Sequence, residues 1–320
     1  MAIDLSVEVA GIRLRNPLVL VSGTCGYGDE MLSLEGFELG AIGAVVLKGI
    51  TLKPLAGNPP PRLVETTGGL INSIGLENRG LDDFLSHRLP VLAQFDAPVI
   101  AQIAGHRKSE YPRLAEALCT RPELAAIEVN ISCPNLERGG LAFGTNPETA
   151  AEVIASVGDV AGEKPLIAKL APAVAELGDV ALACLEAGAK AISLINTLPA
   201  LAIDVETQRP LLGNNTGGLS GPAIKPVALH KVHEVAEAIR AAGRSEAIIG
   251  MGGIWTWTDA VEFHLAGATA IGLGTVNFAN PLAYQGILDG LTGYIKQGGY
   301  ESVRSLIGGL QLNTRHAWDS

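Results

Sequence analysis

Eight short apolar runs recur along the chain, and each is followed by a segment with the apolar spacing of a helix. Runs of this length are typical of parallel strands that are buried on both faces. Eight alternating strand and helix units predict an α/β fold in which the sheet closes into a (β/α)8 TIM barrel. An open doubly wound sheet is the alternative, but residues 22–26 lack the G-x-G-x-x-G turn that usually follows its first strand. The runs occupy residues 18–22, 44–49, 99–105, 127–132, 166–170, 191–197, 247–253 and 270–275.

Three segments fall outside this repeat. Residues 7–9 and 12–14 flank Ala10-Gly11 and predict an N-terminal β-hairpin on the floor of the barrel. Long connections follow strand 2, at about residues 50–78, and strand 6, at about residues 198–221. Both are expected on the carboxyl face of the barrel, where long loops are usually functional. Because no linker is visible, residues 1–320 are predicted to form a single domain.

The composition limits which classes of partner and which cellular compartment we expect. The net charge of −10 argues against nucleic acid and anionic membrane as partners. No uncharged apolar run reaches the ~18 residues that span a bilayer, and the first residues do not resemble a signal peptide. The four cysteines are scattered and lack C-x-x-C spacing. We therefore expect reduced thiols in a cytoplasmic protein, without a metal cluster.

Polar residues stand at the ends of the apolar runs, where barrel enzymes place their active sites. Lys48 and Lys169 each close an otherwise apolar strand. A lysine at this position can neutralise an anion or tune an electron-poor ring, although a single lysine can also extend to solvent. The strand ends carry Ser22, Lys48, Asn130, Cys133, Lys169, Asn196, Thr197 and Thr275.

Glycines follow the seventh and eighth strands, as Gly252-Gly253 and Gly274-Thr275. Barrels often bind phosphate with these two loops, through backbone N–H groups. Turn glycines are the simpler explanation for either pair alone. Their presence in both loops predicts a phosphorylated ligand or cofactor.

Cys133 lies in a loop that contains proline and glycine, so a reactive thiol is favoured over a structural one. Cys25, just after strand 1, is the rival candidate. Cys119 and Cys184 fall in helical patterns and are expected in the core.

Several motifs together resemble class 1 dihydroorotate dehydrogenases over nearly the whole chain. The catalytic-loop motif reads NISCPN at residues 130–135 and GGLAFG at residues 139–144. Further matching motifs are SGTCGYG at 22–28, VLKG at 46–49, NSIGL at 72–76, INT at 195–197, GGLSGPA at 217–223 and GMGG at 250–253. The sequence most resembles class 1B, the catalytic subunit that transfers electrons to NAD⁺ through a partner.

The resemblance implies one FMN per chain in the mouth of the barrel, and dihydroorotate as the substrate. The implied FMN contacts are Ser22, Lys48, Gly49, Gln102, Asn130, Lys169, Ile195, Gly221, Gly252, Gly253, Gly274 and Thr275. The implied substrate contacts are Lys48, Asn72, Ser73, Ile74, Gly75, Leu76, Asn130, Asn196 and Thr197. Asparagines suit a pyrimidine edge, because each amide offers both a donor and an acceptor.

The resemblance also implies a mechanism, with Cys133, Lys48 and Lys169 as the catalytic residues. Cys133 would take the C5 proton of dihydroorotate as a general base while a hydride passes from C6 to N5 of FMN. Lys169 would stabilise negative charge on the reduced flavin. The chain would form a homodimer, and two partner subunits carrying FAD and [2Fe–2S] would complete a heterotetramer. This chain has neither a cysteine cluster nor a dinucleotide fingerprint, so a separate subunit is needed to reach NAD⁺.

Two positions depart from the family pattern. Gln102 stands where asparagine is expected, which puts that FMN contact in doubt, and Ala202 stands where a basic residue is expected. The alternatives are a class 1A-like enzyme linked to fumarate, an enzyme like dihydropyrimidine dehydrogenase, and a barrel without flavin.

Overall fold

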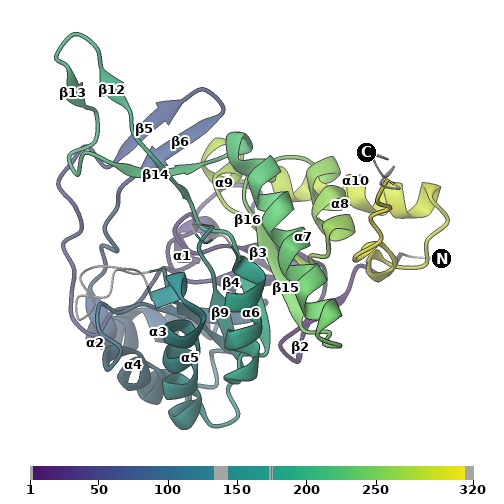
Figure 1. The fold of residues 1–320 in the computed structure, drawn as a ribbon, viewed down its shortest axis with the longest axis horizontal. Helices are drawn as coiled ribbons and strands as arrows, with labels where there is room; N and C mark the ends of the chain where they lie inside the picture. Colours follow the sequence, from purple (N-terminus) through teal and green to yellow (C-terminus); the bar gives the residue numbers. More distant parts are fainter. Residues whose placement is uncertain (1–2, 133–142, 173, 175, 314–320) are drawn as a thin grey trace, which may run out of the picture.

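Eight parallel strands close into a barrel in this computed structural model, which describes residues 3–132, 143–172, 174 and 176–313. Each strand pairs with the next along the chain, and β16 pairs with β3 to complete the ring (Figure 1). The predicted TIM barrel is therefore confirmed, and each of the eight apolar runs overlaps one barrel strand. The strands are β3 (Leu18–Leu20), β4 (Ala44–Val46), β7 (Val99–Ile103), β8 (Ala126–Asn130), β9 (Leu166–Lys169), β10 (Ala191–Leu194), β15 (Ala247–Met251) and β16 (Ala270–Leu273).

Helices surround the barrel, and the longer ones follow strands as a βα repeat requires. A 3₁₀ turn, Pro222–Ile224, leads directly into α7. The longer helices are α4 (Glu110–Leu118), α5 (Pro147–Ala161), α6 (Leu177–Glu186), α7 (Lys225–Ala241), α8 (Trp257–Ala266) and α10 (Ala283–Gln297). Short helices are α1 (Asp29–Leu32), α2 (Gly80–Asp83), α3 (Leu89–Leu92) and α9 (Val276–Ala279).

The barrel strands are buried on both faces because successive side chains point to opposite sides. One set of side chains, such as Val129 and Ile271, belongs to a core cluster that includes the surrounding helices. The alternate set, such as Ile100 and Ile167, belongs to a second cluster inside the barrel. Both sets are apolar near the amino end of the barrel.

The N-terminal hairpin is confirmed, with β1 (Val7–Val9) antiparallel to β2 (Ile12–Leu14). Val7, Val9 and Leu14 are buried in the same cluster as the apolar residues inside the barrel. The hairpin thus packs against the amino end of the barrel interior, as the sequence analysis expected, and leaves the carboxyl end for the site.

The two long connections follow β4 and β10, as predicted, and both also contain strands that the sequence pattern did not predict. They pair with each other into one antiparallel sheet in the order β11-β14-β6-β5. This sheet extends away from the barrel and its helices, with a further small hairpin at its end (Figure 1). Its strands are β5 (Leu63–Thr66), β6 (Gly69–Asn72), β11 (Leu198–Ala200) and β14 (Gly217–Ser220), and the hairpin consists of β12 (Ile203–Asp204) and β13 (Arg209–Pro210). Within the described residues, no helix is long and apolar enough to cross a membrane.

Candidate active site at the carboxyl end of the barrel

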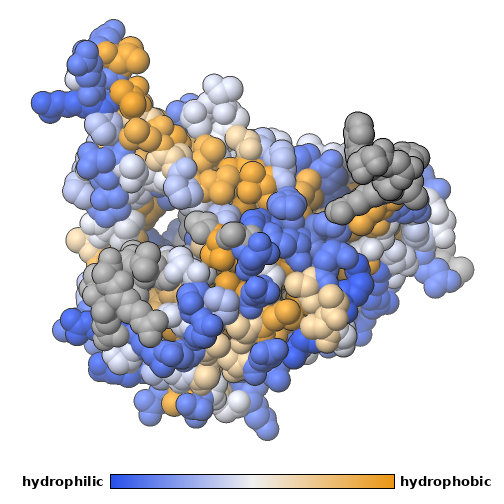
Figure 2. Space-filling model, in the orientation of Figure 1, coloured by the Kyte–Doolittle hydropathy of each residue, from blue (hydrophilic) through white to orange (hydrophobic). Residues whose placement is uncertain are grey.

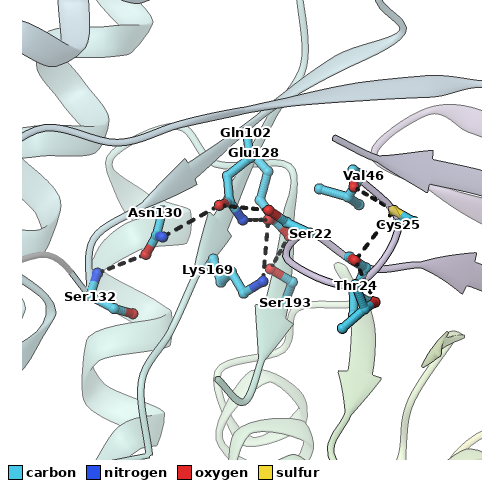
Figure 3. A network of polar contacts seen from close by, with 11 residues as sticks. Ser22, Thr24, Cys25, Val46, Gln102, Glu128, Asn130, Ser132, Lys169 and Ser193 are labelled. Atoms are coloured by element: carbon cyan, nitrogen blue, oxygen red, sulfur yellow. Dashed lines mark hydrogen bonds and ion pairs between the residues drawn. The ribbon is translucent and has the colours of Figure 1, made fainter. Parts of the chain in front are cut away.

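A network of polar side chains lies inside the carboxyl half of the barrel (Figure 3). Ser22 Oγ donates to Gln102 Oε1 at 3.0 Å, and Gln102 Nε2 donates to Glu128 Oε2 at 2.5 Å. Ser193 Oγ donates to the other carboxylate oxygen of Glu128 at 2.7 Å. Lys169 Nζ lies 3.6 Å from Glu128 Oε2. Five strands or strand ends are therefore joined through one carboxylate.

Strand alternation explains why these side chains meet. Gln102 is two residues after Ile100, and Lys169 is two residues after Ile167, so both share the interior side of their strands with a buried apolar residue. Glu128 is fully buried, and the side chain of Lys169 is only 7% exposed. Charges in such an environment need compensation, and each supplies it to the other.

Asn130 extends the network toward the mouth. Its side-chain nitrogen lies 3.5 Å from Gln102 Oε1, and its oxygen accepts a hydrogen bond from the backbone N–H of Ser132 at 3.1 Å. A β-carbon on Gly49 would lie 3.1 Å from the same Gln102 oxygen, so Gly49 also borders the network. Ser22, Gly49, Gln102, Asn130 and Lys169, all predicted FMN contacts, are thus brought together.

Lys48 lies after β4 and is half-buried. Its ammonium is 4.0 Å from Glu77 in the first long connection. Leu76, next to Glu77, approaches Gly49 and has a φ of +54°. This segment of the predicted substrate site therefore folds back onto the end of β4.

Two other predicted substrate residues, Asn72 and Thr197, meet at Gly218 of the projecting sheet. Asn72 Nδ2 donates to the carbonyl of Gly218 at 3.2 Å, and Thr197 packs against the α-carbon of the same glycine. Asn196, beside Thr197, has a buried side-chain oxygen with no hydrogen-bond partner among the described residues. An unpaired buried acceptor is costly unless a ligand donates to it. Ser73 instead accepts a hydrogen bond from Asn58.

The glycines predicted to bind phosphate lie beside Gly221, which the family resemblance implies as an FMN contact. Gly221, Gly252 and Gly253 have positive φ angles of 95°, 127° and 80°, which glycine adopts without steric cost. A β-carbon on Gly253 would lie 2.9 Å from the carbonyl oxygen of Gly221, and one on Gly221 would lie 3.6 Å from Thr275. Ile195 approaches Gly252, and a β-carbon on Gly274 would lie 3.3 Å from Val21.

The cysteines separate into different environments. Cys25 is 2% exposed, and its thiol lies 3.5 Å from the carbonyl oxygens of Val21 and Val46. Burial, with the nearby charge of Glu30, raises the pKa of Cys25 to about 12, although Lys169 acts in the opposite direction. Cys25 is therefore unsuited to act as a base at neutral pH. Cys133 lies outside the described residues, so its predicted role stays a prediction.

The two remaining cysteines differ in burial. Cys184 is fully buried, as expected for a core residue, and burial raises its pKa to about 12. Cys119 is only partly buried, at the edge of the core, where its thiol lies 3.4 Å from the carbonyl oxygen of Val160.

Sequence reasoning missed Glu128 and Ser193. Both interrupt apolar strand runs, as IEVNIS and AISLINT, at positions that alternate with apolar residues. Such a polar residue within a strand buried on both faces is itself a signal of a partner inside the barrel.

The chain matches the family model described as "Dihydroorotate dehydrogenase" over residues 4–295. The chain belongs to the dihydroorotate dehydrogenase family. It is 52% identical over 307 residues to a protein of Geotalea uraniireducens, covering 96% of this chain and 98% of that one. It is 47% identical over 309 residues to a protein of Caldicellulosiruptor saccharolyticus, covering 97% and 100%. Both relatives are named "Dihydroorotate dehydrogenase B (NAD(+)), catalytic subunit".

The fold is also similar to a solved dihydroorotate dehydrogenase of Eimeria tenella in complex with ferulenol. The TM-score is 0.79 at 22% sequence identity, and the match covers 96% of this chain and 88% of that one. At this identity the likeness supports the barrel fold.

Proposed function

We propose that this chain is an FMN-dependent dihydroorotate dehydrogenase that produces orotate for de novo pyrimidine biosynthesis. The observation that carries the proposal is the convergence of a buried lysine network and a glycine backbone cradle at one end of the barrel. Family membership and relatives at about 50% identity over nearly the full length specify the reaction. Residues 1–320 would act as one FMN-binding domain.

The residues at the mouth fit FMN. The backbone around Gly221, Gly252 and Gly253 is so closely packed that a β-carbon would not fit, which leaves N–H groups rather than side chains to face a phosphate. Lys169 and Asn130 supply a cation and an amide for the polar edge of a flavin ring. Bound FMN would supply the acceptor for the hydride that dihydroorotate loses from C6.

The chain's own residues would bind and orient the substrate. Asn72, Asn196 and Thr197 offer donors and acceptors for a pyrimidine edge, and the buried oxygen of Asn196 is available to a substrate N–H. Lys48 would attract the substrate carboxylate, since Glu77, at 4.0 Å, is only a loose partner for its ammonium.

Cys133 is the proposed general base for the C5 proton. It follows Asn130, which lies in the described network, by three residues. Cys25 is the other thiol that follows a strand end, and its raised pKa removes it from this role.

The proposed final acceptor is NAD⁺, reached through a partner subunit that carries FAD and an iron–sulfur cluster. The names of the relatives, which specify both NAD(+) and a catalytic subunit, support this route. Among the described residues no group of three or more histidine, cysteine or acidic side chains could hold a metal.

We also propose a homodimer. The small hairpin that ends the projecting sheet and its flanks carry exposed apolar side chains, seen in orange on the projecting part in Figure 2. Val205, between β12 and β13, is 83% exposed. Apolar side chains gathered on a projection are typical of protein interfaces. They are Leu201, Ile203, Val205 and Leu211.

Anaerobic mixing of the purified FMN-loaded chain with dihydroorotate tests the reaction. We expect loss of the oxidised-flavin absorbance and formation of orotate, without rapid reduction of NAD⁺ by this chain alone. Fumarate and dihydrouracil are assayed in parallel. Turnover with fumarate would indicate the class 1A-like enzyme, and flavin reduction by dihydrouracil alone would indicate the dihydropyrimidine enzyme. A chain that cannot be loaded with FMN would refute the proposal.

A further inference from the structure

A fully buried carboxylate, Glu128, lies beneath the mouth of the barrel and has no role in the mechanism proposed above. It comes from the middle of β8, with an exposed fraction of 0%. Its two oxygens face three neighbouring strands rather than the solvent: Ser193 on β10, Gln102 on β7 and Lys169 on β9 (Figure 3).

Each of these contacts places a hydrogen-bond donor or a cation against the carboxylate. Ser193 and Gln102 donate hydrogen bonds at 2.7 and 2.5 Å, one to each oxygen. The ammonium of Lys169 lies 3.6 Å from the oxygen that also accepts from Gln102. Hydrogen bonds to a charged group are stronger than neutral ones, and a nearby cation adds to them. The carboxylate is therefore fixed in position from two sides.

The same contacts limit where Lys169 can place its charge. A lysine side chain has a flexible four-carbon stem, and its ammonium has no fixed direction of its own. Glu128 supplies that direction, because it is held by side chains from the two strands that flank β8 and β9 in the barrel. Lys169 is nearly buried, so water competes little for its ammonium.

We propose that Glu128 is a positioning residue that holds the Lys169 ammonium at the flavin site and sets the reduction potential of the bound flavin by balancing its charge. This inference rests on the proposed function, because it requires FMN at this mouth. Reduction adds electrons to the flavin ring, so a nearby cation favours reduction and a nearby anion opposes it. Glu128 and Lys169 together place one charge of each sign at this site.

Gln102, the position that departs from the family pattern, is part of this arrangement. Its amide nitrogen reaches Glu128, while its oxygen accepts from Ser22 at 3.0 Å. The side chain thus spans from the buried pair to the strand end at the mouth. An asparagine is one methylene shorter and could not keep both contacts from the same backbone position.

Potentiometric titration of the substrate-free, FMN-loaded protein tests the proposal. Glu128→Gln keeps the shape and an oxygen that can still accept from Lys169, but it removes the negative charge, so the midpoint potential should become more positive. Lys169→Met should make the potential more negative, and the double variant should lie between the two. The matched control is Glu123→Gln, the same chemical change just before the amino end of β8, which should leave the potential unchanged. A Glu128→Gln potential equal to that of the control would overturn the proposal.

Infrared difference spectroscopy gives a second measurement if Glu128→Gln does not fold. In Lys169→Met the buried carboxylate loses the ammonium beside it, so its carboxylate stretching bands should shift from their positions in the unmodified protein. Carboxylate bands that do not shift would show that Lys169 does not interact with Glu128 and would refute the pairing. The two hypotheses fail separately: failure to bind FMN refutes the proposed function, whereas FMN binding with an unmoved potential refutes only the role of Glu128.

Discussion

Replacing Cys25 by alanine tests which of the two thiols that follow strand ends, Cys25 or Cys133, takes the substrate proton. With a pKa of about 12, only about one Cys25 thiol in 10,000 is ionised at pH 8. A free thiol with a pKa of about 8.5 would be roughly one quarter ionised at the same pH. Cys25 therefore supplies roughly 2,500-fold less thiolate than a free cysteine would, and its loss should leave proton abstraction unaffected.

The substitution should instead affect stability. The Cys25 side chain is 2% exposed and contacts two carbonyl oxygens, so removing its sulfur leaves a small cavity. Truncations of this size cost about 1–2 kcal/mol. Because this chain is long, we expect the melting temperature to fall by only a few degrees.

Stopped-flow measurement of flavin bleaching by dihydroorotate, with thermal unfolding alongside, checks both expectations. Cys25→Ala should reduce flavin at a rate within about twofold of the unmodified protein, whereas Cys133→Ser should slow reduction by about 100-fold or more if that residue is the base. Equal slowing by the two substitutions, in proteins that retain FMN and remain folded, would refute the assignment of Cys25 as a structural thiol.

Three further predictions concern the cofactor cradle, pH and assembly. Gly253→Ala should lose bound FMN, measured as flavin absorbance per protein, because its new methyl group meets backbone atoms at under 3 Å; Gly243→Ala, which also has a positive φ but no close neighbour, should keep it. His264 is buried, and burial lowers its pKa to about 4, so only the unfolded chain takes up a proton as the pH falls from about 6.5 toward 4. Stability in urea should thus drop by about 2 kcal/mol between pH 7 and pH 5, and less in His264→Asn; an equal drop in both would contradict this cause. Val205→Glu should convert the proposed homodimer to monomer in sedimentation velocity, whereas Leu312→Glu, also at an exposed apolar residue, should not. An unchanged dimer in Val205→Glu would exclude the hairpin as the interface.

The sequence by itself determined the barrel and the end at which its chemistry lies. Strand residues such as Leu18 and Ala270 belong to runs that are apolar throughout, because helices cover one side of each strand and the barrel interior covers the other. The glycines after the last two strands predict a phosphate site, because the prediction needs only backbone freedom at a known place in the βα repeat. The family motifs extended this to a cofactor and a substrate.

Only the tertiary structure decided which residues meet. The antiparallel sheet joins residues about 146 positions apart, such as Asn72 and Gly218, and short strands with so distant a partner leave no local periodicity. The inert state of Cys25 comes from burial beneath neighbouring segments, which its position after a strand does not reveal. Glu128 and Lys169 lie 41 residues apart in the chain, and their charges are coupled because adjacent strands direct both side chains into the same interior. Local sequence sets the period of an element, whereas the energy of a buried charge depends on the partner that barrel closure places beside it.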